Sequence, residues 1–78
     1  MSLATLRFSG SRMQEAREEA WLTREQVAVA IGRGYPTILA YEQGKYRPPA
    51  GVCKRIARVL GVTVADLMAI DDVKPDDA

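Results

Sequence analysis

Residues 23–44 constrain the fold more than any other stretch of the chain. Thr23 and Gln26 have the spacing of a capping box, in which each side chain accepts a hydrogen bond from the other residue's backbone N–H group. Gly32 can adopt the left-handed backbone conformation that commonly ends a helix. The pattern therefore predicts a short helix that begins at Thr23 and ends at Gly32. The residues expected on its buried face are Val27, Ala28 and Ile31.

A second short helix is expected directly after the first. Gly34 can cap it, and Pro36 falls in its first turn, where proline is tolerated because no backbone N–H group is needed there. Ile38 and Tyr41 are one turn apart and are expected to face inward, and Gly44 closes the helix. Two helices of about two turns each cannot bury their apolar faces against each other alone. The pair therefore predicts a helix-turn-helix that packs against the rest of the chain.

Three more helices are expected around this pair. One begins at Ser9, one opens at Pro49, and one is capped by Thr63, with Asp66 at its third position. The expected core stripe of the helix after Pro49 is Cys53, Ile56, Ala57 and Leu60. We expect no strand of useful length, so the predicted fold class is all-α, with five helices.

Charge and apolar content divide the chain into three parts. We expect an N-terminal arm at residues 1–8, the helix-turn-helix domain at 9–70, and an acidic, disordered tail at 71–78. Residues 1–60 hold ten Lys and Arg against five Glu, whereas residues 61–78 hold five Asp against one Lys. A basic body suits weak attraction to a polyanion, although the acidic end can equally be a solvated terminus.

Composition excludes several function classes. The 78 residues contain no histidine and a single cysteine, Cys53, so neither a zinc site nor an internal disulfide is expected. The sequence has no nucleophile–base pair and no glycine-rich phosphate loop, so we expect no enzyme, no cofactor and no catalytic residue. No apolar run reaches the roughly 18 residues of a membrane span, and no signal peptide is recognisable. A cytoplasmic protein without membrane contact is expected.

The turn and its surroundings resemble a known family, the phage-repressor (Cro-like, xenobiotic-response-element) family of bacterial transcriptional regulators. The residues that carry the resemblance are Ala28, Gly32, Ile38 and the run Glu42-Gln43-Gly44-Lys45. The resemblance covers roughly residues 8–68. It implies a compact, lambda-repressor-like domain that binds a double-stranded DNA operator, usually as a homodimer, and acts as a repressor.

The resemblance also implies which residues touch DNA. The second helix of the motif, about residues 35–43, would lie in the major groove. Base contacts would come from Arg33, Gly34, Tyr35, Pro36, Leu39, Ala40 and Gln43. Phosphate contacts would come from Arg24, Thr37, Lys45 and Arg47. A structural ion pair would join Arg17 to Glu42.

The centre of this contact set is unusually apolar. Direct readout favours Arg on guanine and Asn or Gln on adenine, because those side chains make two hydrogen bonds at once. The four central residues, Tyr35, Pro36, Leu39 and Ala40, offer thymine-methyl contacts or a single hydrogen bond instead. The same apolar face motivates an alternative function, in which the chain is a protein-interaction module or the antitoxin of a toxin–antitoxin pair.

Trp21 departs from the family pattern, which often has glycine at the end of the first helix. Tryptophan disfavours a positive φ angle. We therefore expect this link to be built differently, with the indole ring covering the edge of the core. A contact with a partner molecule is the alternative role for the ring.

Overall fold

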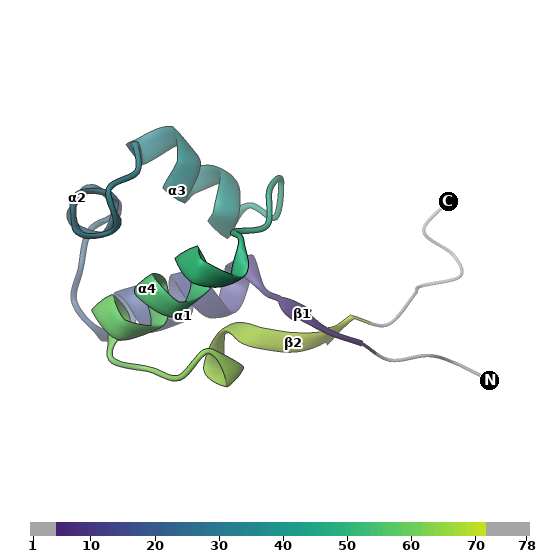
Figure 1. Cartoon of the computed structure of the whole chain (residues 1–78). Coiled ribbons are helices and arrows are strands. Elements are labelled where there is room, and N and C mark those ends of the chain that lie inside the picture. Colours follow the sequence, from purple (N-terminus) through teal and green to yellow (C-terminus); the bar gives the residue numbers. More distant parts are fainter. Residues whose placement is uncertain (1–4, 72–78) are drawn as a thin grey trace.

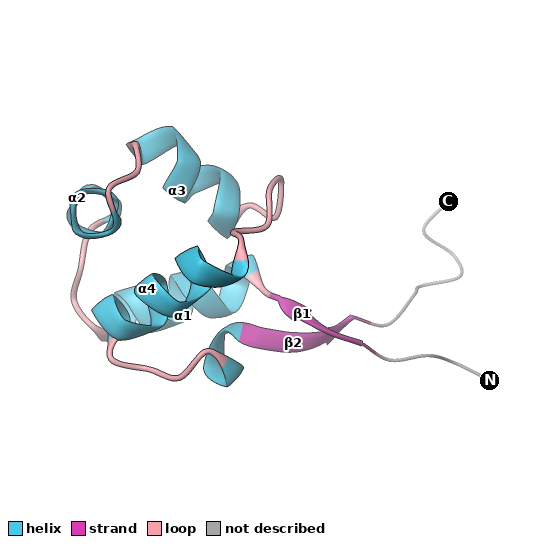
Figure 2. Ribbon diagram, viewed as in Figure 1, coloured by secondary structure: helices cyan, strands magenta, loops and turns pink. Residues whose placement is uncertain are grey.

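The computed structural model describes residues 5–71, which form a small helical body with a two-stranded sheet that projects from it (Figure 1). In chain order the elements are strand β1 (Thr5–Phe8), helices α1 (Gly10–Glu19), α2 (Arg24–Ile31), α3 (Tyr35–Glu42) and α4 (Ala50–Leu60), the short 3-10 helix η1 (Ala65–Leu67) and strand β2 (Met68–Asp71). Figure 2 shows that helices make up the body and that both strands lie on one side of it.

The predicted helix starts at Ser9, Thr23 and Gly34 are confirmed. The capping box of α2 is complete: the Gln26 N–H group donates to Thr23 Oγ1 at 3.0 Å, and the Thr23 N–H group donates to Gln26 Oε1 at 2.8 Å. Ser9 Oγ accepts from the Arg12 N–H group at 3.2 Å at the start of α1. These starts were readable because capping is a local interaction between residues three apart.

The core lies between the four helices and η1. The predicted inward residues of α2 and α3 are buried, as is the stripe along α4. The largest fully buried side chains are Met13, Val27, Ile31, Ile38, Ile56 and Leu67. Cys53 is buried too, and burial raises the pKa of its thiol because the thiolate would lose solvation.

The fold is mostly helical, as predicted, but the expectation that it has no strands is wrong, and the predicted fifth α-helix does not form. The hydrogen bonds expected between Thr63 and Asp66 do form, since the Asp66 N–H group donates to Thr63 Oγ1 at 3.1 Å and the Thr63 N–H group donates to the Asp66 carboxylate at 2.9 Å. Only one 3-10 turn follows. The chain then extends as β2 and pairs antiparallel with β1, with Leu6 opposite Ile70 and Phe8 opposite Met68.

This strand pair was not readable from the sequence because its two halves lie at opposite ends of the chain. Residues 5–8, expected in the arm, are half of the sheet, and Asp71, expected in the tail, ends the other half. Residues 1–4 and the remainder of the acidic tail, for which disorder was expected, lie outside the described residues.

The alternative role of the indole ring, a contact with a partner molecule, stays a prediction. The expectations of a differently built link and of a ring that covers the edge of the core are wrong for Trp21. Its φ angle is 59°, and its side chain is 91% exposed rather than packed on the core. The Trp21 N–H group donates to Glu18 O at 3.0 Å and the Leu22 N–H group donates to Arg17 O at 3.1 Å. This pattern is a Schellman motif, which requires the left-handed conformation at Trp21. The chain therefore ends α1 in the ordinary way and accepts strain at a tryptophan.

Candidate DNA interface

A buried carboxylate holds the helix-turn-helix against the first helix. Glu42, at the end of α3, accepts from Arg17 Nε at 2.7 Å and from Arg24 Nε at 2.8 Å, and its side chain is 2% exposed. Arg17 Nη1 also donates to Leu22 O at 2.9 Å. The pair of Arg17 and Glu42 is the one that the resemblance implied, and Arg24 adds a second arginine from α2. One carboxylate thus connects α1, α2 and α3.

Arg24, for which the resemblance implied a phosphate contact, is also part of this ion-pair network. Its side chain is only 29% exposed, and Nε is used by Glu42. Hydrogen bonds to Glu42 first, and then to Tyr35, raise the pKa of the guanidinium group. Arg24 therefore lies between the carboxylate at the end of α3 and the first residue of that helix. Sequence spacing did not indicate this bridge, because the three residues come from two helices.

Fewer residues are exposed on the outer face of α3 than the sequence suggested. Tyr35, Pro36 and Gln43 are exposed, as are Arg33 and Gly34 just before the helix, whereas Leu39 and Thr37 are half-buried. Ala40 is buried, with 8% of its surface exposed, so little of its side chain is available for the base contact that the resemblance implied.

The loop after α3 folds back over the last turn of the helix. Gly44 has a φ angle of 77°, and the chain turns back so that the Lys45 N–H group donates to Ala40 O at 2.9 Å. The Tyr46 N–H group approaches the same carbonyl at 3.5 Å. The loop thereby lies against the turn of α3 that contains Ala40, which leaves the N-terminal part of the helix as its accessible face.

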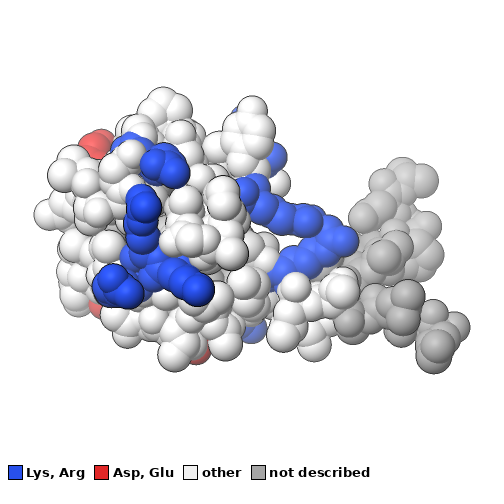
Figure 3. Space-filling model, in the orientation of Figure 1, with Lys and Arg blue, Asp and Glu red and all other residues white. Residues whose placement is uncertain are grey.

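Basic residues flank this accessible face. Arg33 precedes α3, and its Nη1 donates to Gly32 O at 3.3 Å, while Lys45 and Arg47 are exposed in the loop that follows the helix. In Figure 3 the Lys and Arg side chains gather in two places, one over the helical body and one between the loop after α3 and β1. Few Asp or Glu side chains are visible on this face.

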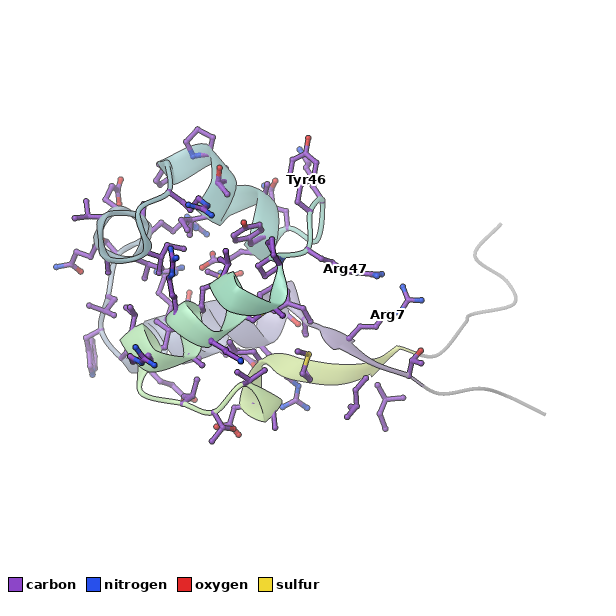
Figure 4. The ribbon with its side chains drawn as sticks, viewed as in Figure 1. Arg7, Tyr46 and Arg47 are labelled. Atoms are coloured by element: carbon purple, nitrogen blue, oxygen red, sulfur yellow. The ribbon has the colours of Figure 1, made fainter. Side chains whose placement is uncertain are left out.

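The second of these basic places contains Arg7 and Tyr46, which sequence reasoning missed, beside the predicted Arg47. Arg7 extends from β1 toward the loop, where Arg47 extends toward the same space and Tyr46 stands beside it (Figure 4). An open hollow of about 280 Å³ separates them. The sequence had no clear signal for Arg7, because the run Leu6-Arg7-Phe8 is too short to indicate a strand and Leu6 is exposed in the structure.

Within residues 5–71, no helix has the length and apolar character needed to cross a membrane. The same residues contain no group of three or more His, Cys, Asp or Glu side chains arranged to hold a metal ion.

Comparison with known proteins identifies relatives of this chain. Residues 10–69 match the model of the helix-turn-helix domain family HTH_31. An uncharacterized HTH-type transcriptional regulator of Archaeoglobus fulgidus is 36% identical over 62 residues, which cover 80% of this chain and 89% of that protein. The cryptic phage CTXphi transcriptional repressor RstR of Vibrio cholerae is 34% identical over 67 residues, which cover 86% of this chain and 60% of RstR.

A similar fold occurs in the crystal structure of SinR, the master regulator for biofilm formation, in complex with DNA. The TM-score is 0.69 at 22% sequence identity, and the match covers 74% of this chain and 94% of that chain. The family match spans most of the sequence and agrees with the observed α2–turn–α3 geometry. The chain therefore belongs to the helix-turn-helix domain family of transcriptional regulators.

Proposed function

We propose that this protein regulates transcription by binding a double-stranded DNA operator, with α3 inserted into the major groove. The observation that carries this proposal is the accessible N-terminal face of α3, which basic residues flank while Glu42 anchors the helix from behind. A reading helix must be held rigidly, because base contacts tolerate little displacement. SinR, whose structure was determined in complex with DNA, has a similar fold and supports the proposal that this fold binds DNA.

The base contacts are assigned by exposure. Tyr35 and Pro36 are exposed in the first turn of α3, and Leu39 is half-buried one turn later. Their apolar groups suit thymine methyl groups, whereas Gln43 can make two hydrogen bonds to adenine and Arg33 can do the same to guanine. Gly34 allows the backbone itself to approach the groove. Sequence preference would thus combine methyl contacts with DNA shape.

The phosphate contacts are assigned to both sides of the groove. Lys45 and Arg47 are exposed after α3, and Thr37 is half-buried within it. The N-terminus of α2 adds backbone N–H groups and a positive dipole end. Because Nε of Arg24 is used by Glu42, a phosphate contact from Arg24 would use its terminal nitrogen atoms.

We further propose that the protein acts in the cytoplasm as a homodimer that represses its target genes. One domain of this size reaches only a few base pairs, and dimers of helix-turn-helix proteins bind half-sites about 34 Å apart. The match to RstR, a phage repressor, supports repression, although this chain spans 60% of RstR.

Selection of bound duplexes from a random DNA library, at low and then at physiological salt, tests the proposal. We expect an enriched motif with two-fold symmetry. Retention of DNA at low salt without any motif would mean phosphate binding without base readout. No retention at either salt concentration would contradict DNA binding and would favour a protein partner on the exposed Tyr35 and Pro36 face.

A charge variant separates DNA binding from protein binding. Changing Arg33, Lys45 and Arg47 together to Gln should abolish binding to the selected duplex, because three contacts at the groove are lost. The matched control changes Lys54, Arg55 and Arg58 to Gln, which removes the same charge from exposed positions on α4. Equal losses in both triple variants would show that net charge alone attracts DNA. A protein partner held by the apolar face would remain bound to the first variant.

A further inference from the structure

The outer half of the strand pair carries an apolar face that the helical body leaves open. Leu6 of β1 and Ile70 of β2 lie directly opposite each other in the antiparallel register, so their side chains share one face of the pair. Leu6 is 69% exposed and Ile70 is 62% exposed. Two large apolar side chains are therefore exposed side by side on this face.

The same face continues into the core. Phe8 and Met68 form the next pair of opposite residues on this face, two positions closer to the body. Both are half-buried, and the Phe8 ring meets Tyr41 edge-on with 6.4 Å between the ring centroids. The helices thus cover the inner half of the face, whereas the outer half extends beyond them (Figure 1).

The opposite face of the strand pair has a different character. Arg7 lies there opposite Ala69, and Figure 4 shows the arginine side chain extending toward the loop after α3. A sheet with one polar and one apolar face ordinarily buries its apolar face. A two-stranded sheet is also only marginally stable in water unless it packs against something else. The outer half of the Leu6 and Ile70 face therefore lacks the cover that its chemistry favours.

We propose that the Leu6 and Ile70 face packs against the same face of a second copy of this chain. This inference rests on the homodimer proposed above, and it names the surface that forms that dimer. A two-fold axis brings a surface onto itself, so the surface must be complementary to itself. Uncharged apolar side chains meet this requirement, because identical apolar groups associate in water whereas identical charges repel each other.

The ends of the chain are the alternative cover for this face. Residues 72–78, which follow β2, contain three Asp and one large apolar residue, Val73. Such a solvated acidic segment gains little from lying on apolar side chains. Residues 1–4, which precede β1, contain Met1 and Leu3. Cover by these residues of the same chain predicts a monomer, whereas cover by a second copy predicts a dimer.

Pairing through this face leaves both recognition helices accessible. In Figure 1 the strand pair extends away from the end of the body where α3 begins. Two side chains per copy cover well under the roughly 800 Å² per partner of a stable interface. We therefore expect a dimer that dissociates on dilution and that an operator with two half-sites stabilises, because the duplex holds both copies close together.

Sedimentation velocity over a series of protein concentrations tests the interface without DNA. Changing Leu6 and Ile70 together to Thr should weaken dimerisation about tenfold or more, because both copies lose their apolar contacts. Threonine is β-branched and suits a strand, so the pairing of β1 with β2 should survive. The matched control is Val29→Thr, which changes an apolar side chain that is 83% exposed on α2. Equal dissociation constants in the double variant and the control would overturn the interface.

A pair of charge variants keeps failure of folding apart from failure of dimerisation. Ile70→Lys and Ile70→Glu should each be monomeric alone, because like charges would meet across the two-fold axis. An equal mixture of the two variants should recover a dimer, which a misfolded chain could not do. A mixture that stays monomeric would overturn the packing of one strand pair on the other.

Binding to duplexes with one or two half-sites distinguishes this inference from the proposed function. If the wild type dimerises and the threonine variant dimerises equally well, only this interface fails and the homodimer remains. If the wild type is monomeric at every concentration and two half-sites bind it no more tightly than one, the homodimer and this interface fail together. Binding of the monomer to a single half-site would still support DNA recognition by α3.

Discussion

At the scale of single residues, Trp21 is the clearest conflict between side chain and backbone. Among residues 5–71 it is the one non-glycine residue with a positive φ angle. The left-handed conformation costs a residue with a Cβ atom about 1–2 kcal/mol relative to glycine. With 91% of its surface exposed, the ring recovers little of this cost by burial. The cap therefore imposes a backbone conformation that glycine would adopt without strain, and burial of the tryptophan ring does not compensate for it.

Replacing Trp21 with Gly should increase the free energy of unfolding by about 1 kcal/mol, because the Schellman motif is kept and the strain is removed. Urea denaturation followed by circular dichroism measures this change. Trp21→Ala is the matched control, since it removes the ring but keeps a Cβ atom at the same φ angle. Equal stabilisation by both substitutions would show that the exposed ring, rather than the backbone, is the source of the strain.

At the scale of elements, the approach of α1 to α3 depends on Gly10. A Cβ atom at this position would collide with the backbone carbonyl oxygens of Tyr41 and Glu42, at the end of α3. These atoms belong to the backbone and cannot move aside as a flexible side chain could. The first turn of α1 therefore packs directly on the recognition helix.

Replacing Gly10 with Ala should reduce the free energy of unfolding by about 2–3 kcal/mol, because the added methyl group forces the two helices apart. Gly51 in α4 is the matched control, since a Cβ atom there meets no other atom within 4 Å. Gly51→Ala should be neutral or stabilising by up to about 1 kcal/mol, because alanine favours the helix. Chemical denaturation measures the free energy of unfolding of both variants. An equal change in the two would contradict the close contact between Gly10 and the end of α3.

At the scale of the whole molecule, Glu42 connects three helices that are separated along the chain. Its carboxylate accepts hydrogen bonds from Arg17 of α1 and Arg24 of α2, so it sets the orientation of α3 in the helical body. The carboxylate of Glu42 thus pairs with two positive charges at once. Its own side chain and that of Arg17 are almost fully buried. Losing the carboxylate would leave the buried Arg17 guanidinium without its partner.

Replacing Glu42 with Gln should reduce the free energy of unfolding by about 3 kcal/mol, because an unpaired buried charge remains. The same variant should weaken binding to the selected duplex, since α3 loses its anchor. Guanidinium denaturation and fluorescence anisotropy measure the two effects. The control is Glu25→Gln at an exposed position on α2. A Glu42 variant as stable as this control would show that apolar packing alone orients α3.

Local interactions account for what could be predicted. The helix starts at Ser9, Thr23 and Gly34 are where the sequence placed them, because caps and inward faces depend on residues a few positions apart. The same reasoning correctly placed the hydrogen bonds between Thr63 and Asp66, but the α-helix expected after them is a single 3-10 turn. A cap indicates where a helix can begin, whereas the length of the helix depends on what the following residues contact.

Long-range contacts account for the rest of the fold and the candidate site. The sequence by itself determined the helix starts, the buried faces and the membership of the helix-turn-helix family, since these follow from periodicity and short motifs. Only the tertiary structure decided that residues 5–8 and 68–71 pair as β1 and β2, that Ala40 is buried, and that Arg7 and Arg47 line the same hollow. Each of these depends on segments that approach one another only after the chain has folded.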